Sequence, residues 1–247
     1  MPTINDNEVS LAVLIDADNT PYRSIGQVLD HCHKFGNAVI KRAYGDWSRS
    51  NLKEWDSIFR EYAIKPMQQF QYTNRKNSTD IAMVIDAMDM LHTQSIGAFI
   101  LITSDSDFTA LAIRIREQGI KVIGIGRKTA PTSFVKGCEE FVYIENLVTP
   151  LDKENTEEIE IVQIASAEVR DGRELLIKAI QNTVDENGIV LGSNLGLMLI
   201  KIDPSFSPKN YGFKKLSKFI DQYPDILLFK EMKGGDMKYK VVDSNLG

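Results

Sequence analysis

The feature that most constrains the fold is a series of six apolar segments in the first 144 residues. Most of them are separated by stretches in which apolar residues have helical spacing. The first, SLAVLID at residues 10–16, is a continuous apolar run that ends in an acid, which is typical of a strand buried on both faces. Alternating strands and helices build parallel β-α-β units, so the pattern predicts an α/β fold, a three-layer sandwich with a parallel sheet. The predicted strands are 10–16, 38–44, 63–70, 98–103, 121–125 and 141–144, and the predicted helices are 22–35, 52–62, 80–91 and 108–118.

The helix that begins near Asp80 is predicted to bury one apolar face. Ser78 or Thr79 stands at its start and can cap its N-terminus. Asp86 and Asp89 are predicted to lie on its solvated face. The residues expected on the buried face are Ile81, Val84, Ile85, Met88 and Leu91.

Residues 149–170 differ in character from the chain on either side. The stretch DKENTEEIEIVQ is acidic, and residues 151–170 carry a net charge of −4, which is typical of an exposed linker. After it, three helical segments and two strand segments around KGGD, a two-glycine hairpin signal, form a winged-helix arrangement. We therefore predict a first domain over residues 9–148, an acidic linker over 149–170 and a winged-helix-like domain over 171–243.

The composition excludes several classes of protein. Hydrophobic residues make up 43% and charged residues 26%, which excludes a wholly disordered chain. Two cysteines cannot form a disulfide framework or a four-cysteine zinc site, and they suit buried thiols in a reducing cytosol. The longest apolar runs, such as 97–102, are far shorter than the about 20 residues of a membrane span, and the start carries no signal-peptide pattern. We expect a cytoplasmic protein with no membrane association.

Carboxylates stand at the predicted strand ends. Asp16 and Asp18 follow the first strand, Asp105 and Asp107 follow the fourth, and Asp80 opens a helix. Ligands of parallel α/β sheets bind outside the carboxyl ends of the strands, so these acids are expected to converge. Clustered carboxylates repel one another, and a bound Mg²⁺ or Mn²⁺ relieves that repulsion, activates water and neutralises charge at a phosphate. The pattern indicates a metal-dependent phosphodiesterase, and Asp18 is its weakest member because it can instead cap the helix after Pro21.

The segment LIDADNT also fits the DxDxT motif of haloacid dehalogenase-like phosphatases, in which the first Asp attacks phosphorus. That family needs a downstream lysine and a late acidic pair after a further strand. Glu139 and Glu140 are the only such pair, and they stand in an awkward place for this role. The phosphatase is therefore the weaker alternative.

A stronger resemblance covers about residues 10–148. The segments VLIDADN, KRAYGDW, KNSTDIAMVIDAMD, FILITSDSDFTAL, IKVIGIG and EEFVYIENL resemble, in their order, NYN-domain proteins of the LabA-like group, which are related to PIN-domain nucleases. The resemblance implies a PIN-like α/β fold and a Mg²⁺- or Mn²⁺-dependent ribonuclease. Asp86 matches a recurrent acid of the family's helix. By residue match the metal-site acids are Asp16, Asp80, Asp105 and Asp107, with Asn19 and Ser104 as polar residues beside them.

The tail resembles a LOTUS domain, also called OST-HTH. The opening helix, the small-residue turn, PSFSPKNYGFKKLSKFI and the final hairpin carry the resemblance, which implies RNA or protein binding. The aromatic residues of that stretch and Leu216 are predicted to pack in the core. The predicted contacts with a partner are Lys209, Lys214, Lys215 and Lys218.

Basic residues in loops or at element ends can ring the acids and hold phosphates. Single-stranded RNA is the expected partner, and a protein is a second possibility for the tail, where residues 201–240 carry a net charge of +4. The alternative from another class is a non-enzymatic RNA-binding adaptor. The acids argue against it, because a face that only binds a polyanion should be basic. The basic residues are Arg42, Arg49, Arg75, Lys76, Arg127 and Lys128.

Overall fold

The computed structural model describes residues 8–70, 77–148, 171–233 and 236–242. They belong to two compact units, which divide between Thr149 and Pro150. The predicted acidic linker lies outside the described residues, as do Arg75 and Lys76. The domain bounds proposed from the sequence stay predictions.

In the described part of the first unit, six parallel strands form one sheet in the order β3-β2-β1-β4-β5-β6. The chain winds outward in one direction from β1 and in the other from β4. The carboxyl ends of these two central strands therefore form the switch point at which such sheets bind ligands. The strands are β1 Ser10–Asp16, β2 Asn37–Gly45, β3 Lys65–Gln68, β4 Ala98–Ile102, β5 Lys121–Gly126 and β6 Glu140–Tyr143.

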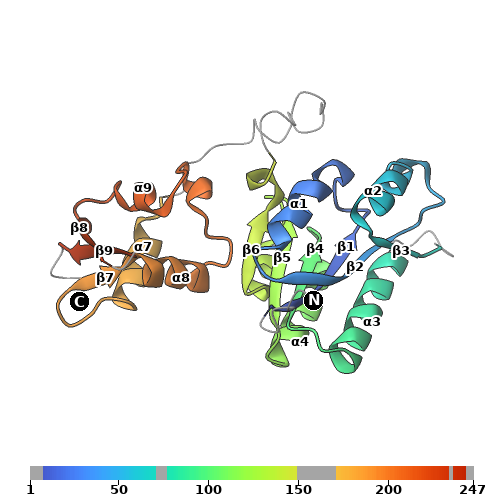
Figure 1. Ribbon diagram of the computed structural model, residues 1–247, viewed down its shortest axis with the longest axis horizontal. Helices are drawn as coiled ribbons and strands as arrows, with labels where there is room; N and C mark the ends of the chain where they lie inside the picture. Colours follow the sequence, from blue (N-terminus) through green and yellow to red (C-terminus); the bar gives the residue numbers. More distant parts are fainter. Residues whose placement is uncertain (1–7, 71–76, 149–170, 234–235, 243–247) are drawn as a thin grey trace, which may run out of the picture. The chain divides into compact units, whose positions relative to one another are not determined.

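Helices cover both faces of this sheet, with α1 and α2 on one side and α3 and α4 on the other (Figure 1). Alternate residues of β1 point to opposite faces. Leu11, Val13 and Ile15 pack in the core under α1 and α2, whereas Ala12 and Leu14 pack in the core under α3, α4 and α5. This arrangement confirms the predicted three-layer α/β fold. The helices are α1 Ile25–Cys32, α2 Trp55–Tyr62, α3 Ser78–Thr93, α4 Thr109–Glu117 and α5 Thr132–Gly137.

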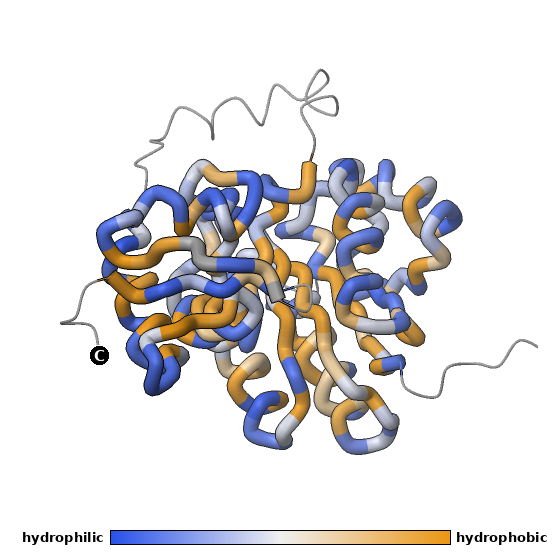
Figure 2. Tube along the Cα trace, turned by 60° about the vertical axis from the view of Figure 1, so that its left-hand side comes forward, coloured by the Kyte–Doolittle hydropathy of each residue, from blue (hydrophilic) through white to orange (hydrophobic). Residues whose placement is uncertain are grey.

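Hydrophobic residues dominate the strands, whereas the helices alternate between hydrophobic and hydrophilic stretches (Figure 2). Cys32 and Cys138 are buried free thiols, as predicted. Residues 132–137 form α5, which the sequence did not predict because six residues are too few to display a helical period. No helix among the described residues is long and apolar enough to span a bilayer.

The buried face of α3 differs from the prediction. Ile81 and Ile85, which were expected to be buried, are 57% and 56% exposed. Apolar residues occur on several sides of this helix, so their spacing alone could not select the side that packs on the sheet. The helix also begins at Ser78, with Asn77 at the N-cap position, so the predicted side-chain cap is wrong. The buried residues of α3 are Thr79, Met83, Ala87, Met90 and Leu91.

The second unit has the predicted winged-helix arrangement. Helices pack on a sheet whose described strands pair antiparallel in the order β7-β9-β8. The predicted helix 211–222 is instead a 3₁₀ turn and α9, and Gly212 separates them with a φ of +84°, which favours glycine. Tyr211 and Phe219 are buried, which confirms their predicted place in the core. The elements are α7 Arg173–Gln181, β7 Ile189–Leu191, α8 Gly192–Ile202, α9 Leu216–Ile220, β8 Leu227–Lys233 and β9 Asp236–Val241.

Candidate active site

The candidate active site lies at the carboxyl ends of β1 and β4. Asp16 is the last residue of β1, and the pairing of Ile15 with Ile102 places it beside the segment that follows β4. That segment turns sharply, because the Asp105 carboxylate accepts a hydrogen bond of 3.0 Å from the Asp107 N–H. The cap brings two carboxylates out of the same short turn.

Three carboxylates from two elements meet at this edge. Asp80 in the first turn of α3 and Asp105 and Asp107 after β4 each offer one oxygen within 4.8 Å of the other two. Asp80 and Asp105 are half-buried, and Asp107 is exposed. No histidine belongs to this group among the described residues. An all-oxygen donor set that is open to solvent on one side suits a hard divalent cation, which keeps several waters.

Asp16 lies next to this group but is held differently. Its side chain is buried, and its Oδ2 accepts hydrogen bonds from Thr103 Oγ1 at 2.7 Å and Asn19 Nδ2 at 2.8 Å. Burial raises the pKa of Asp16, and the hydrogen bonds from Asn19 and Thr103 oppose that rise. Asp16 is not one of the three acids that meet within 4.8 Å, so the predicted four acids divide into a group of three and a neighbour.

Thr103 connects the two parts of the site, and the sequence analysis missed it. The side chain is buried, and its hydroxyl donates to Asp16 and accepts the Asp105 N–H at 3.1 Å. An ionised carboxylate can only accept, so the single hydroxyl proton of Thr103 is donated to Asp16 when Asp16 is ionised. The signal in the sequence is a polar residue that directly follows an apolar strand and precedes two acids. The same pattern also fits the last residue of a strand, so it does not by itself indicate a role for Thr103.

The electrostatics of Asp80 reflect the crowding of negative charge. Burial, together with the charges of Asp16, Asp105, Asp107 and Asp18, raises the pKa of Asp80 to about 6. A cation bound among these acids would remove the repulsion.

Two hydroxyl groups beside Asp80 are also unusual. Ser78 Oγ and Thr79 Oγ1 are buried, and neither has a hydrogen-bond partner among the described residues. Buried polar atoms normally find a partner in the protein or in ordered water.

Asn19 and Ser104, predicted to lie beside the acids, both support loops at the site. The Asn19 backbone N–H also reaches Asp16, at 3.3 Å from Oδ1. Ser104 Oγ accepts the Arg127 N–H at 2.8 Å and so joins the loops that follow β4 and β5. Gly126 permits this approach, because a Cβ there would lie 2.3 Å from the Thr103 carbonyl oxygen.

Three predicted phosphate-binding residues have exposed side chains near these loops. Arg127 and Lys128 follow the carboxyl end of β5 and are exposed. Arg49 lies 3.4 Å from Asp18, so the two loops that follow β1 and β2 are joined by an ion pair. Asp18 therefore serves this pair, and the predicted cap on the helix after Pro21 is wrong. Lys76 lies outside the described residues.

Arg42 has a different environment from the other basic residues. Its Nη1 lies 2.5 and 2.7 Å from the two carboxylate oxygens of Asp86, and Tyr44 also donates to Asp86. The Asp86 side chain is 18% exposed, so its predicted place on the solvated face of α3 is wrong, whereas Asp89 is exposed as predicted. A helix wheel cannot show that a basic residue of a neighbouring strand faces Asp86.

The predicted contacts of the second unit lie on its surface. Lys209, Lys214, Lys215 and Lys218 are exposed. Lys218 Nζ lies 3.1 Å from Asp221, an exposed pair that holds the lysine only weakly.

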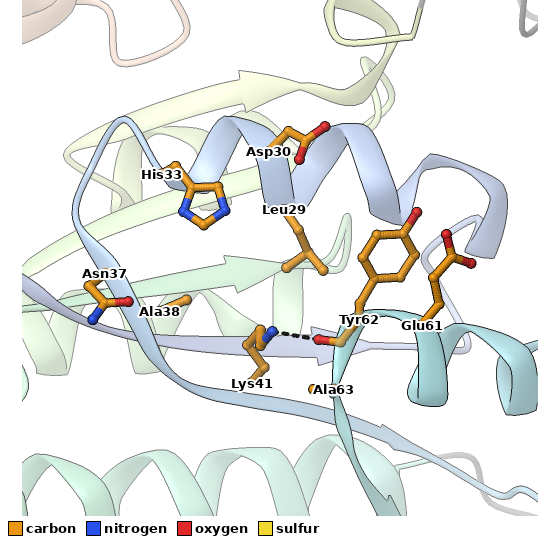
Figure 3. A pocket seen from close by; sticks show the side chains of 9 residues that line it. All are labelled: Leu29, Asp30, His33, Asn37, Ala38, Lys41, Glu61, Tyr62 and Ala63. Atoms are coloured by element: carbon orange, nitrogen blue, oxygen red, sulfur yellow. Dashed lines mark hydrogen bonds between the residues drawn. The ribbon is translucent and has the colours of Figure 1, made fainter.

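A surface cavity of about 380 Å³ lies elsewhere in the first unit, between α1, β2 and α2 (Figure 3). Its lining includes Asp30, His33 and Lys41, and Lys41 Nζ donates to the Tyr62 carbonyl at 2.5 Å. None of the predicted acids lines it. The candidate site is therefore the carboxylate group at the carboxyl ends of β1 and β4, where parallel sheets bind their ligands.

The acidic pair of the phosphatase alternative lies at the opposite edge of the sheet. Glu140 is the first residue of β6 and lies 3.5 Å from Lys121, the first residue of β5. Both are at amino ends of strands, whereas Asp16 ends β1. Glu139 and Glu140 therefore do not complete a haloacid dehalogenase-like site around Asp16.

Two family models match this chain, one in each of its two units. A family model described as the NYN domain matches residues 10–145, and one described as the OST-HTH/LOTUS domain matches residues 168–239. An uncharacterized protein of Methanocaldococcus jannaschii is 27% identical over 154 residues, which are 61% of this chain and 61% of the relative. A crystal structure of a protein of unknown function from Vibrio parahaemolyticus is similar at a TM-score of 0.48 and 20% identity, over 57% of this chain and 96% of that one.

Proposed function

Because this chain belongs to the NYN-domain family and carries a C-terminal OST-HTH/LOTUS domain, we propose that it is a metal-dependent ribonuclease with its own RNA-binding module. NYN domains are nucleases, and OST-HTH/LOTUS domains bind RNA. The observation that carries the proposal is the approach of the Asp80, Asp105 and Asp107 carboxylates to within 4.8 Å at the switch point of the sheet.

In this proposal the three carboxylates hold Mg²⁺ or Mn²⁺. The donor set supports this, because it contains only oxygens and because burial, together with the charges of the neighbouring acids, raises the pKa of Asp80. When bound, such an ion activates water and neutralises the charge that develops at a phosphate. The protein's part is to hold the acids at a fixed spacing.

Asp16 lies next to the three acids and is held by its own hydrogen bonds. Thr103 and Asn19 both donate to Oδ2, so this oxygen is occupied. Among the described residues, Oδ1 accepts only the 3.3 Å bond from the Asn19 N–H. This oxygen can therefore accept a proton or a hydrogen bond from water beside the three acids, and the raised pKa of Asp16 favours that role.

Binding and cleavage would be divided between different residues. Arg127 and Lys128 are exposed beside the acids and can hold phosphates of the strand being cut. Lys214, Lys215 and Lys218 would bind single-stranded RNA in the second unit. A protein partner for that unit is the alternative.

The direct test replaces Asp105 with Asn in the full chain. The variant keeps an oxygen that can accept the Asp107 N–H, but it loses a metal ligand with a full charge. Mn²⁺-dependent cleavage of single-stranded RNA should fall by at least about 100-fold. RNA binding should stay the same or improve slightly, because a negative charge is removed. Asp89→Asn is the matched control, since it makes the same change on the exposed face of α3.

Two outcomes would contradict the proposal. A wild-type chain that binds RNA but cleaves none in either Mg²⁺ or Mn²⁺ would favour the non-enzymatic adaptor. Rapid hydrolysis of a small phosphate ester, lost in Asp16→Asn, would favour a phosphatase.

A further inference from the structure

A polar network joins α3 to β2 behind the carboxylate group. Arg42 and Tyr44 lie two residues apart on β2, so their side chains point to the same face of the sheet. Both donate to the carboxylate of Asp86, which lies in the middle of α3. The Arg42 and Asp86 side chains are only 20% and 18% exposed, so the ion pair is shielded from water.

Tyr44 ties this network to the end of β1. Its residue is fully buried, and it pairs in register with Asp16 at the end of the parallel ladder. Its carbonyl accepts the Ala17 N–H at 3.1 Å, while its hydroxyl donates to Asp86. One residue therefore contacts both the strand that ends in Asp16 and the helix that carries Asp80.

Asp86 and Asp80 belong to the same helix, α3. Asp80 precedes Asp86 by six residues, which is about 9 Å along a helix axis. Between them Ile81 and Ile85 are exposed, so only part of this segment packs on the sheet. Apolar packing leaves a helix some freedom to slide and rotate, whereas charge-assisted hydrogen bonds fix a direction.

We propose that Asp86, with Arg42 and Tyr44, is a positioning device that holds α3 so that Asp80 meets Asp105 and Asp107. This inference rests on the proposed metal site and deepens it. It gives Arg42 a role other than binding a substrate phosphate, because its guanidinium already neutralises Asp86. Asp86 is then an acid of α3 that serves the metal site without being a ligand.

The experiment measures Mn²⁺ binding by the full chain through the electron paramagnetic resonance signal of free Mn²⁺. In Asp86→Asn the side chain keeps its shape and loses its charge, and in Tyr44→Phe only the hydroxyl is removed. Both variants should bind Mn²⁺ more weakly, by about 10-fold or more for Asp86→Asn, as is common when the residues that orient a metal ligand are changed. RNA cleavage lost at low Mn²⁺ should return at saturating Mn²⁺.

Glu140→Gln is the matched control. It breaks the Lys121–Glu140 pair, which also joins two elements of this unit but lies at the amino ends of the strands. A general loss of stability would change all three variants, whereas positioning changes Mn²⁺ affinity in Asp86→Asn and Tyr44→Phe alone. Amide hydrogen exchange without metal should also quicken over residues 81–85 of α3 in those two variants.

Wild-type Mn²⁺ affinity in Asp86→Asn and Tyr44→Phe would overturn the inference and leave the proposed function intact. Weaker RNA binding by both Arg42→Gln and the Asp86→Asn/Arg42→Gln double variant, with Mn²⁺ affinity unchanged, would instead make Arg42 a phosphate-binding residue. A wild-type chain that binds no Mn²⁺ would overturn the proposed metal site, and this inference would fall with it.

Discussion

The carboxylates at the candidate site of the first unit and two carboxylates of the second unit have opposite surroundings. In the first unit, burial and neighbouring acids raise the pKa of Asp80 to about 6. In the second unit, the Ser193 hydroxyl and N–H hold the pKa of Asp236 below its usual value, and the Arg173 guanidinium does the same for Asp225. One set of acids has like charges beside it, and the other has hydrogen-bond donors beside it.

This difference shows what each surface can bind. Uncompensated acids at a sheet edge favour a cation. In the second unit, Asp236 and Asp225 are engaged by Ser193 and Arg173, while Lys214 remains exposed. An exposed lysine surface favours a polyanion. The contrast matches a division of labour in which one unit cuts RNA and the other holds it.

After Asp105→Asn, the largest effect on the acidic side of this comparison is expected from Thr103→Val. The change keeps the side-chain shape but removes the donor to Asp16 and the acceptor of the Asp105 N–H. Cleavage of single-stranded RNA at fixed Mn²⁺ should fall by about 10- to 100-fold, and Thr103→Ser should restore most of it.

Thr20→Val is the control for that experiment. Thr20 is also buried, and its hydroxyl donates to the Ile102 carbonyl rather than to an acid. Similar losses in both variants would show that a buried hydroxyl matters only for stability. The distinct role of Thr103 as a link between the acids would then be wrong.

On the basic side, replacing Lys214, Lys215 and Lys218 together with Ala should weaken RNA binding by about 10-fold at moderate salt. Binding releases fewer counterions when three phosphate contacts are lost. The slope of log affinity against log salt should therefore fall by about two for single-stranded RNA. Cleavage of saturating RNA should be nearly unchanged. Labelled RNA titrated at several salt concentrations measures both quantities.

The double variant Lys178→Ala/Lys201→Ala controls for net charge, because these exposed lysines lie on α7 and α8 of the same unit. An equal fall in slope per lysine removed in the control would mean that charge alone, rather than this lysine surface, binds RNA. An unchanged slope in the triple variant would favour a protein partner for the second unit.

The smallest expected effect is on stability, and it comes from the cost of charging Asp80 in its half-buried place beside the other acids. The pKa of Asp80 rises from 3.8 to about 6 on folding, so the folded state binds more protons than the unfolded state between these values. Its contribution to stability therefore falls as the pH rises through this window. Asp80→Asn should stabilise the protein at pH 7.5 by about 1 kcal/mol, discounted for solvent screening, and by much less near pH 4.

Chemical denaturation at the two pH values measures this change. Mn²⁺ should stabilise the wild-type chain at pH 7.5 and stabilise Asp80→Asn much less. Equal stability of the two chains at pH 7.5 without metal would show that burial and the neighbouring acids do not disfavour the charged form of Asp80, and the comparison between the units would lose its basis.

Much of the fold could be predicted from local patterns. An apolar run that ends in an acid predicts a buried strand and its carboxyl end, and both Asp16 and Asp105 lie where that rule places them. Parallel strands that alternate with helices share one orientation, so their carboxyl ends fall on one edge. The aromatic core of the second unit followed from the same kind of spacing, as the burial of Phe219 shows.

Only the tertiary structure decided which side of α3 faces the sheet and which polar groups meet there. Ile81 and Ile85 had the spacing of a buried face but are exposed, because the sheet packs against Met83 and Ala87 instead. That rotation brings Asp86 to Arg42, 44 residues away in sequence. Sequence spacing determines how residues lie within one helix or strand, whereas contacts between elements depend on their register and rotation, which the packing of the whole core sets.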